Sequence, residues 1–147
     1  MGIQKPSQRF SYALRALVDL ALHQGTGPVT VKAIAKRQKI PLRYLEQLFH
    51  RLRQHGLVMA ERGPRGGYRL SRSPREISVS TIFQTLEQNG KTAPHVFSRS
   101  ESDPTVTVWR QVEMAVKTTL QATTLEALVT QAREQNATVN HRFTFHI

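Results

Sequence analysis

Cysteine is absent from the 147 residues of this sequence, so disulfides, thiolate metal sites and cysteine nucleophiles are excluded. Long apolar runs are also absent: no stretch approaches the roughly 18 apolar residues that span a bilayer. The first residues, Met1 to Pro6, contain no apolar signal core. We therefore expect a cytoplasmic protein with no membrane partner. A hydrophobic share of 39% predicts a folded globular chain.

Acidic residues are scarce in the first half of the chain. Residues 1–75 hold fifteen Lys and Arg against three acids, Asp19, Glu46 and Glu61. Residues 76–147 hold six bases against seven acids, so the net charge of +11 is concentrated in the first half. This segregation favours a first half that binds a polyanion, above all nucleic acid. A basic helix on a membrane surface is the alternative, but the bases are spread over several predicted elements.

Apolar spacing predicts three helices in the basic half. Apolar residues recur at intervals of three and four from Ser7 to His23, which is typical of an amphipathic helix. Thr30 is a good N-cap for a short helix from Val31 to about Gln38. A third helix runs from about Pro41 to His55 and ends at Gly56. We expect the third helix to bury Leu42, Leu45, Leu48, Phe49 and Leu52.

A hairpin follows the third helix. Two extended runs, Leu57–Glu61 and Tyr68–Ser71, flank residues 62–67, which contain three glycines and one proline. That composition is typical of a hairpin tip. Ser78 can cap a fourth helix from Val79 to about Gln88. Three helices and a glycine-tipped hairpin predict a winged helix-turn-helix, so the expected fold class is mainly α with a small β-hairpin wing.

The second half predicts a long helix that carries a dimer interface. Residues 89–103 lack periodicity, and Pro104 opens a helix with an apolar stripe that is too large to leave exposed on one small domain. A turn or helix covers Thr124 to Gln135, and the polar tail from Asn136 to Ile147 is either flexible or adds a short strand. The predicted homodimer contacts are Trp109, Val112, Val116 and Leu120.

We therefore divide the chain into three parts. Residues 1–88 form a winged helix-turn-helix DNA-binding domain, residues 89–103 a sensor-type loop, and residues 104–147 the long dimerisation helix and tail. No linker separates these parts clearly enough to make independent domains.

The third predicted helix and the hairpin tip carry groups that can read DNA. Arg pairs with guanine, Gln with adenine, and Glu accepts a hydrogen bond from cytosine. Arginines at a wing tip suit a narrow minor groove, whose negative potential attracts guanidinium groups. The alternatives are an ordinary solvated helix face and a surface turn. The predicted DNA-binding residues are Arg43, Tyr44, Glu46, Gln47, Arg51, Arg62 and Arg65.

Several runs of this sequence carry a family resemblance. They are Tyr12–Ala21, Tyr44–Phe49, Leu52-Arg53, Gly56–Val58, Arg62–Tyr68 and Ile77–Val79, together with Trp109 and Thr124-Leu125. In these runs the chain resembles the iron–sulfur cluster regulator family of bacterial winged-helix transcription regulators, the IscR and NsrR type. The resemblance covers about residues 7–132 and implies a dimer on imperfect palindromes. It also implies that Glu46 governs base choice and that Arg62 enters the minor groove.

The chain departs from the family pattern at the DNA face. Pro41 stands where the family often has a capping Ser, Arg43 replaces a small polar residue, and Arg65 replaces a Gly. The two arginines add charge beside the DNA, so the family's target sequences should not be transferred to this chain.

The chain also departs from the family at the sensor. Cluster-binding members carry three cysteines in the loop before the dimer helix. The last of these falls at Asp103, and a further ligand of some members falls at Val106. His95 is the only histidine in this loop, and we expect it to be exposed instead of a metal ligand. We therefore expect no iron–sulfur cluster, no metal site and no cofactor.

Two functions fit these observations. The leading hypothesis is a sequence-specific repressor that binds a palindromic operator in double-stranded DNA as a homodimer. The second is a constitutive, low-specificity DNA-binding or architectural protein whose sensor has been lost. An enzyme fits poorly because the sequence offers no phosphate loop, nucleophile–base pair or metal set. The sequence does not identify an effector, which could be a small molecule, a protein partner or nothing at all.

Overall fold

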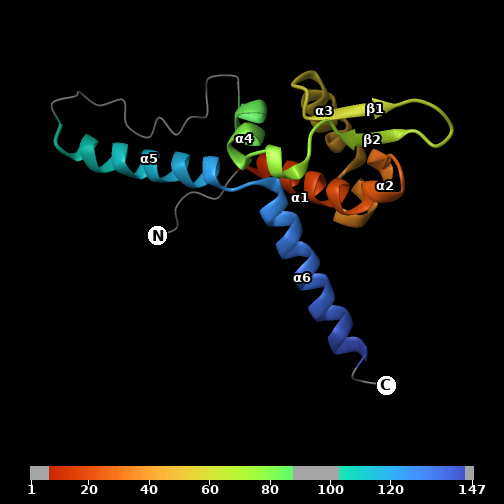
Figure 1. The fold of residues 1–147 in the computed structure, drawn as a ribbon. Helices are drawn as coiled ribbons and strands as arrows, with labels where there is room; N and C mark the ends of the chain where they lie inside the picture. The colour runs from red at the N-terminus through yellow and green to blue at the C-terminus, as the bar shows by residue number, and fades with distance from the viewer. Residues whose placement is uncertain (1–6, 88–102, 145–147) are drawn as a thin grey trace.

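The computed structural model describes residues 7–87 and 103–144 (Figure 1). Within those residues the chain is mainly helical with one two-stranded antiparallel sheet, as predicted. The elements in chain order are α1 (Gln8–His23), η1 (Gln24–Thr26), α2 (Val31–Gln38), α3 (Leu42–Gln54), β1 (Val58–Glu61), β2 (Gly67–Leu70), η2 (Pro74–Glu76), α4 (Val79–Glu87), α5 (Thr105–Ala122) and α6 (Leu125–Thr144).

Local signals in the sequence set the ends of these helices. The Thr30 hydroxyl accepts a hydrogen bond from the Ala33 N–H at 3.1 Å, and the Ser78 hydroxyl caps Thr81 at the same distance. Gly56 follows α3 in the left-handed conformation, with φ of 74°. These side-chain caps satisfy N–H groups that lack a partner inside the helix. The expected N-caps and the glycine stop after α3 are therefore confirmed.

The core lies between α1, α2, α3 and α4, and α3 contributes four of its side chains. Apolar residues at intervals of three and four point inward from each helix. Leu42, which we expected to be buried, is 38% exposed because it opens α3 between two exposed neighbours, Pro41 and Arg43. The largest fully buried side chains are Phe49, Leu17, Leu20, Ile34, Leu45, Leu52, Leu57, Ile77, Ile82, Leu86, Leu125 and Val58.

The hairpin is joined to the helical body at its base. β1 pairs with β2 from Val58↔Leu70 to Glu61↔Gly67. Val29, in the connection before α2, forms a further antiparallel bridge with Tyr68 through two backbone hydrogen bonds of 2.9 and 2.7 Å. A Cβ on Gly67 would lie 2.6 Å from the backbone of Val29, so this close approach requires glycine.

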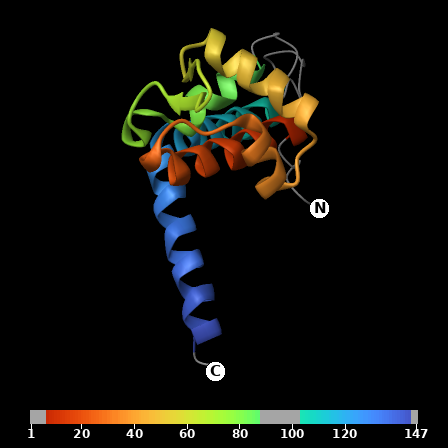
Figure 2. The ribbon, with the colours of Figure 1, turned by 90° about the vertical axis from the view of Figure 1, so that its right-hand side faces the viewer.

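The last two helices extend away from this body in different directions (Figure 1). α6 is anchored at its start by the buried side chains of Leu125 and Val129 and then projects from the side opposite α3 (Figure 2). It continues to Thr144, so the expected end near Gln135 and the alternative of a short strand after it are wrong for residues 136–144. The reason is that residues 125–144 contain neither Pro nor Gly. None of the described helices has the length and apolar character needed to cross a membrane.

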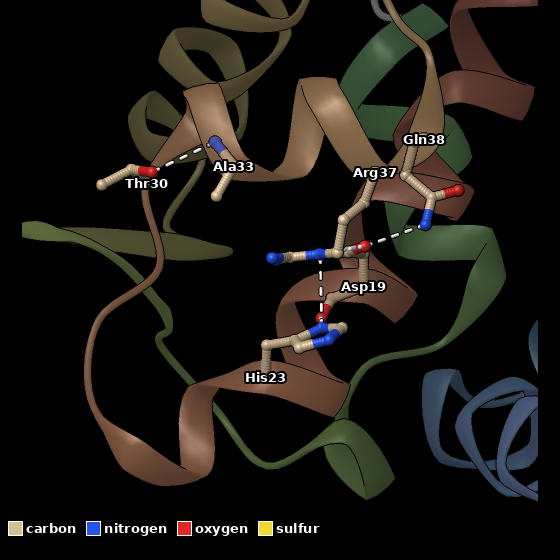
Figure 3. A network of polar contacts seen from close by, with 6 residues as sticks. All are labelled: Asp19, His23, Thr30, Ala33, Arg37 and Gln38. Atoms are coloured by element: carbon tan, nitrogen blue, oxygen red, sulfur yellow. Dashed lines mark hydrogen bonds and ion pairs between the residues drawn. The ribbon is translucent and has the colours of Figure 1, made fainter.

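A buried carboxylate joins α1 to α2 (Figure 3). Asp19 on α1 is 2% exposed and accepts three hydrogen bonds of 2.7 to 3.2 Å from the guanidinium of Arg37 on α2. Gln38 donates a further bond of 2.9 Å, and the His23 ring nitrogen lies 3.4 Å from the same carboxylate. The hydrogen bond with Asp19 raises the pKa of the Arg37 guanidinium above its ordinary value. Asp19 therefore has the partners that a buried charge needs.

Replacing Arg37 with Ala should destabilise the fold by about 1–3 kcal/mol, because the buried Asp19 carboxylate loses its cationic partner but keeps Gln38. Urea denaturation followed by circular dichroism measures the change. Lys36→Ala is the matched control, since Lys36 is an exposed neighbour on the same helix, and its effect should stay within about 0.5 kcal/mol. Equal effects of the two substitutions would contradict the role given to the buried pair.

Candidate nucleic-acid interface

The exposed face of α3 presents polar and basic side chains along a shallow hollow. Arg43, Glu46 and Gln47 are all exposed there, as the sequence predicts. The hollow has a volume of about 630 Å³ and includes one residue of α1. Its lining residues are Arg9, Arg43, Tyr44, Glu46, Gln47, Leu48, His50, Arg51 and Gln54. Three of these are arginines and only one is acidic, so the hollow offers a cationic surface to a polyanion.

The three acids of the basic half occupy different environments. Asp19 is buried with Arg37, and Glu61 accepts a hydrogen bond of 2.6 Å from Arg69 across the hairpin. Glu46 is exposed and has no hydrogen-bond or ion-pair partner among the described residues. Its carboxylate is therefore available to accept a hydrogen bond from a base, although it stands among cations that would attract phosphate.

Tyr44 is half-buried and lies against α1. Its ring meets the ring of Tyr12 edge to face, with the centroids 5.6 Å apart, and the Arg15 guanidinium lies 5.6 Å from the centre of the Tyr12 ring. Such aromatic pairs stabilise the contact between two helices. Tyr44 is thus a packing residue at the edge of the interface, a role that its place in the sequence motif did not reveal.

Arg51 differs from the other predicted DNA-binding residues because its guanidinium has a protein partner. Its Nη1 donates a hydrogen bond of 2.9 Å to the backbone carbonyl of Leu86 at the end of α4. Arg9 donates to the same carbonyl at 3.4 Å. Sequence reasoning missed this contact, because nothing in the spacing relates residue 51 to residue 86. A DNA contact by Arg51 stays a prediction.

The wing tip presents two arginines, Arg62 and Arg65. Arg62 and Arg65 are exposed, and neither has an ion-pair partner among the described residues. Arg69, which lies in β2, forms an ion pair with Glu61, so its guanidinium already has a partner. Figure 1 shows the base of the hairpin next to α3 and the tip directed away from that helix. A helix of this kind fits the major groove of DNA, and a wing tip can reach the adjacent minor groove.

Comparison with known proteins agrees with this geometry. A family model with the description "Rrf2: Iron-dependent Transcriptional regulator" matches residues 6–131, which is most of the chain. The chain belongs to the Rrf2 family. It is 40% identical, over 96% of its length and 98% of the relative's, to a Synechocystis protein described as an HTH-type transcriptional regulator. It is also 49% identical over 78 residues to the regulator IscR of Sodalis glossinidius, a match that spans 53% of this chain and 47% of that protein.

Solved Rrf2-type structures share this fold. The structure of CymR, the global cysteine regulator of B. subtilis, matches with a TM-score of 0.76 and 35% identity over 88% of this chain and 98% of that one. T. potens IscR matches with a TM-score of 0.77 and 38% identity over 90% of both chains. The resemblance seen in the sequence and the predicted winged-helix class are therefore confirmed.

This Rrf2 chain does not fit a thiolate-held iron–sulfur cluster. It has no cysteine, and cluster iron is held by cysteine thiolates. At Asp103, where the sequence resemblance places the last cysteine of cluster-binding members, the carboxylate accepts hydrogen bonds from the hydroxyl and the N–H of Thr105, at 2.7 and 2.9 Å. Both bonds lower the pKa of the Asp103 carboxyl, and the bond from the Thr105 hydroxyl has the larger effect. Asp103 thus bonds to the first turn of α5. Val106 occupies the other position at which the resemblance implies a cluster ligand, and its side chain cannot bind iron.

No cluster of three or more potential metal ligands occurs within residues 7–87 and 103–144. His95 and most of the expected sensor-type loop, 89–103, lie outside the described residues.

Replacing Glu46 with Ala should change the base preferred at one position of each half-site. General affinity for DNA should be unchanged or higher, because the substitution removes a negative charge near phosphates. Selection of bound duplexes from a random library, followed by fluorescence anisotropy, measures both effects. Glu134→Ala, which removes an exposed acid from α6, is the control and should leave base preference unchanged. An identical base preference of wild type and the Glu46 variant would refute a reading role for Glu46.

Replacing Arg62 or Arg65 with Ala should weaken DNA binding by about 1–3 kcal/mol, because a groove contact is lost. Anisotropy titrations at fixed salt give the two affinities. Arg133→Ala removes the same charge from an exposed position on α6 and should change affinity much less. If neither wing substitution exceeds that control, the wing does not enter a groove.

Proposed function

We propose that this Rrf2 chain is a sequence-specific DNA-binding repressor that binds a palindromic operator as a homodimer, without an iron–sulfur cluster. The observation that carries the proposal is the unpaired Glu46 between Arg43 and Gln47 on α3, next to a wing tipped with Arg62 and Arg65. The helix face would read bases in the major groove, and the wing would contact the adjacent minor groove.

Glu46 favours specific over general DNA binding. An exposed carboxylate on a cationic face lowers affinity for any phosphate backbone, because like charges repel. That loss is recovered only where a base donates a hydrogen bond to the carboxylate, as cytosine does. A protein that only coats DNA gains nothing from such a residue. Discrimination between sites therefore explains Glu46 better than low-specificity binding does.

The apolar stripe on α5 supports a homodimer. None of the residues of α5 is buried, and exposure reaches 56% for Val108, 40% for Trp109 and Val112, and 46% for Val116. These residues lie on one side of the helix at intervals of three and four, while Leu120 at its far end packs against the core. A second copy that covers this stripe would hold two recognition helices at a fixed separation, which suits a palindrome.

Repression is the outcome that we propose for operator binding, and selection of sites tests the proposal as a whole. The wild-type protein should enrich a palindromic sequence from a random duplex library. It should bind that sequence at least about a thousandfold more tightly than a scrambled duplex at physiological salt. A template that carries the site within a promoter should then be transcribed less when the protein is added. Binding without enrichment would instead support the low-specificity alternative.

Replacing Val112 or Val116 with Glu should produce monomers and remove most operator affinity, since a single half-site binds weakly. Sedimentation velocity at micromolar concentration gives the oligomeric state, and anisotropy gives the affinity. Thr118→Glu places the same charge on the opposite side of α5, so it should remain dimeric. A wild-type monomer under these conditions would contradict the homodimer.

Protein prepared without oxygen should be colourless and contain no stoichiometric iron or acid-labile sulfide, because the chain supplies no thiolate. Its affinity for the selected site should not change after nitric oxide treatment. A cysteine-containing member of the family, handled in parallel, is the control for cluster retention. A visible charge-transfer spectrum in this protein would overturn the prediction.

A further inference from the structure

Three helices meet at the carbonyl oxygen of Leu86. Leu86 lies one residue before Glu87, the last residue of α4 that the structure describes. The Arg51 guanidinium from α3 donates to this oxygen at 2.9 Å, and the Arg9 guanidinium from α1 donates at 3.4 Å. One residue later, the Glu87 carboxylate accepts a bond of 3.0 Å from the hydroxyl of Ser7, which caps α1.

The charges at this junction are complementary. A backbone carbonyl oxygen carries a partial negative charge, which attracts the guanidinium groups that donate to it. A hydrogen bond from a charged donor is also stronger than one between neutral groups. Arg51 is the group from α3 that makes this bond, and its side chain is partly buried. The junction therefore connects α3 to Leu86 of α4.

The hydrogen bond from Arg51 constrains the part of α3 that we propose to face DNA. Apolar side chains hold one side of α3 in the core, but such contacts are non-directional. The bond from Arg51 is directional, and it restricts rotation of α3 about its own axis. Gln47 lies one helical turn before Arg51, and Glu46 lies just beyond that turn. A rotation at Arg51 would therefore move both side chains relative to the bases.

We propose that Arg51 is a positioning residue for DNA recognition, which orients the reading face of α3 through the carbonyl of Leu86. The inference rests on the proposed function, because it assumes that α3 reads bases. Arg9 contributes to the same junction through its longer bond.

The salt dependence of binding distinguishes positioning from a direct phosphate contact. Loss of one phosphate contact weakens binding to all DNA alike and reduces the salt slope by about one. Loss of positioning leaves affinity for a scrambled duplex and the salt slope unchanged. It lowers only the preference for the selected site and broadens the base profile at the position that Glu46 reads. A purely structural residue would lower the melting temperature without altering that profile.

The experiment compares Arg51→Gln, Arg51→Lys and Arg9→Gln with the wild type. The probes are the duplex most enriched by the wild type and a scrambled duplex of equal length, each titrated at several salt concentrations. Arg53→Gln removes the same charge from an exposed position two residues along α3 and is the control. Arg51→Gln should lower the ratio of specific to scrambled affinity by about tenfold, a change of about 1.4 kcal/mol. Arg9→Gln should lower it less, and Arg51→Lys should recover part of the loss.

A parallel loss on both duplexes, with a salt slope reduced by about one, would overturn the inference and assign Arg51 to a phosphate contact. An unchanged ratio in all three variants would also overturn it. If Arg51→Gln does not fold, Arg51→Lys and Arg9→Gln still decide the matter. A wild type without site preference would overturn the proposed function together with the inference, whereas the first two outcomes leave the proposed function intact.

Discussion

The contact between Asp19 and Arg37 is the constraint on which the DNA-facing half of the molecule depends. Asp19 is the one charged side chain that is buried in the described part of the chain, and α2 supplies both its guanidinium and its amide partner. Because an uncompensated buried charge is costly, these contacts favour the observed position of α2 against α1. The turn from α2 to α3 passes through Lys39 in the left-handed conformation, so the position of α2 also sets where α3 begins.

The few acids of the basic half show how the same residue type serves different purposes. Asp19 connects α1 to α2 through Arg37, and Glu61 pairs with Arg69 within the hairpin. Glu46 has neither task among the described residues, and its position on α3 is the reason to relate it to bases. Asp103, at the expected sensor position, has a further role, because its carboxylate accepts hydrogen bonds from Thr105 in the first turn of α5. Counting charges along the chain points to the basic half as the candidate interface, but only the local partners of each acid distinguish these roles.

Sequence patterns predicted the elements well where the signals were local. Apolar periodicity, the Thr30 cap and the glycine-rich run 62–67 depend on neighbouring residues, and the structure places the helices and hairpin there. Long-range contacts were not predictable from spacing. The bond from Arg51 to Leu86 and the ring contact of Tyr44 join residues that are far apart in sequence, so the spacing along α3 predicts neither contact. The end of α6 was missed because polar helices that lack an apolar stripe resemble flexible tails.

The way in which the hairpin is joined to the body has a consequence for the thermodynamics of DNA binding. Its base is held by strand pairing, by the bridge to Val29, and by the contact of the Tyr68 and Phe49 rings, whose centroids are 5.0 Å apart. Even the tip is closed by a hydrogen bond of 2.9 Å from the Gly66 N–H to the Gly63 carbonyl. Ordering a free residue costs about 1–2 kcal/mol of conformational entropy. The wing is therefore largely preorganised, so little of that entropic penalty would oppose the groove contacts that we propose for its arginines.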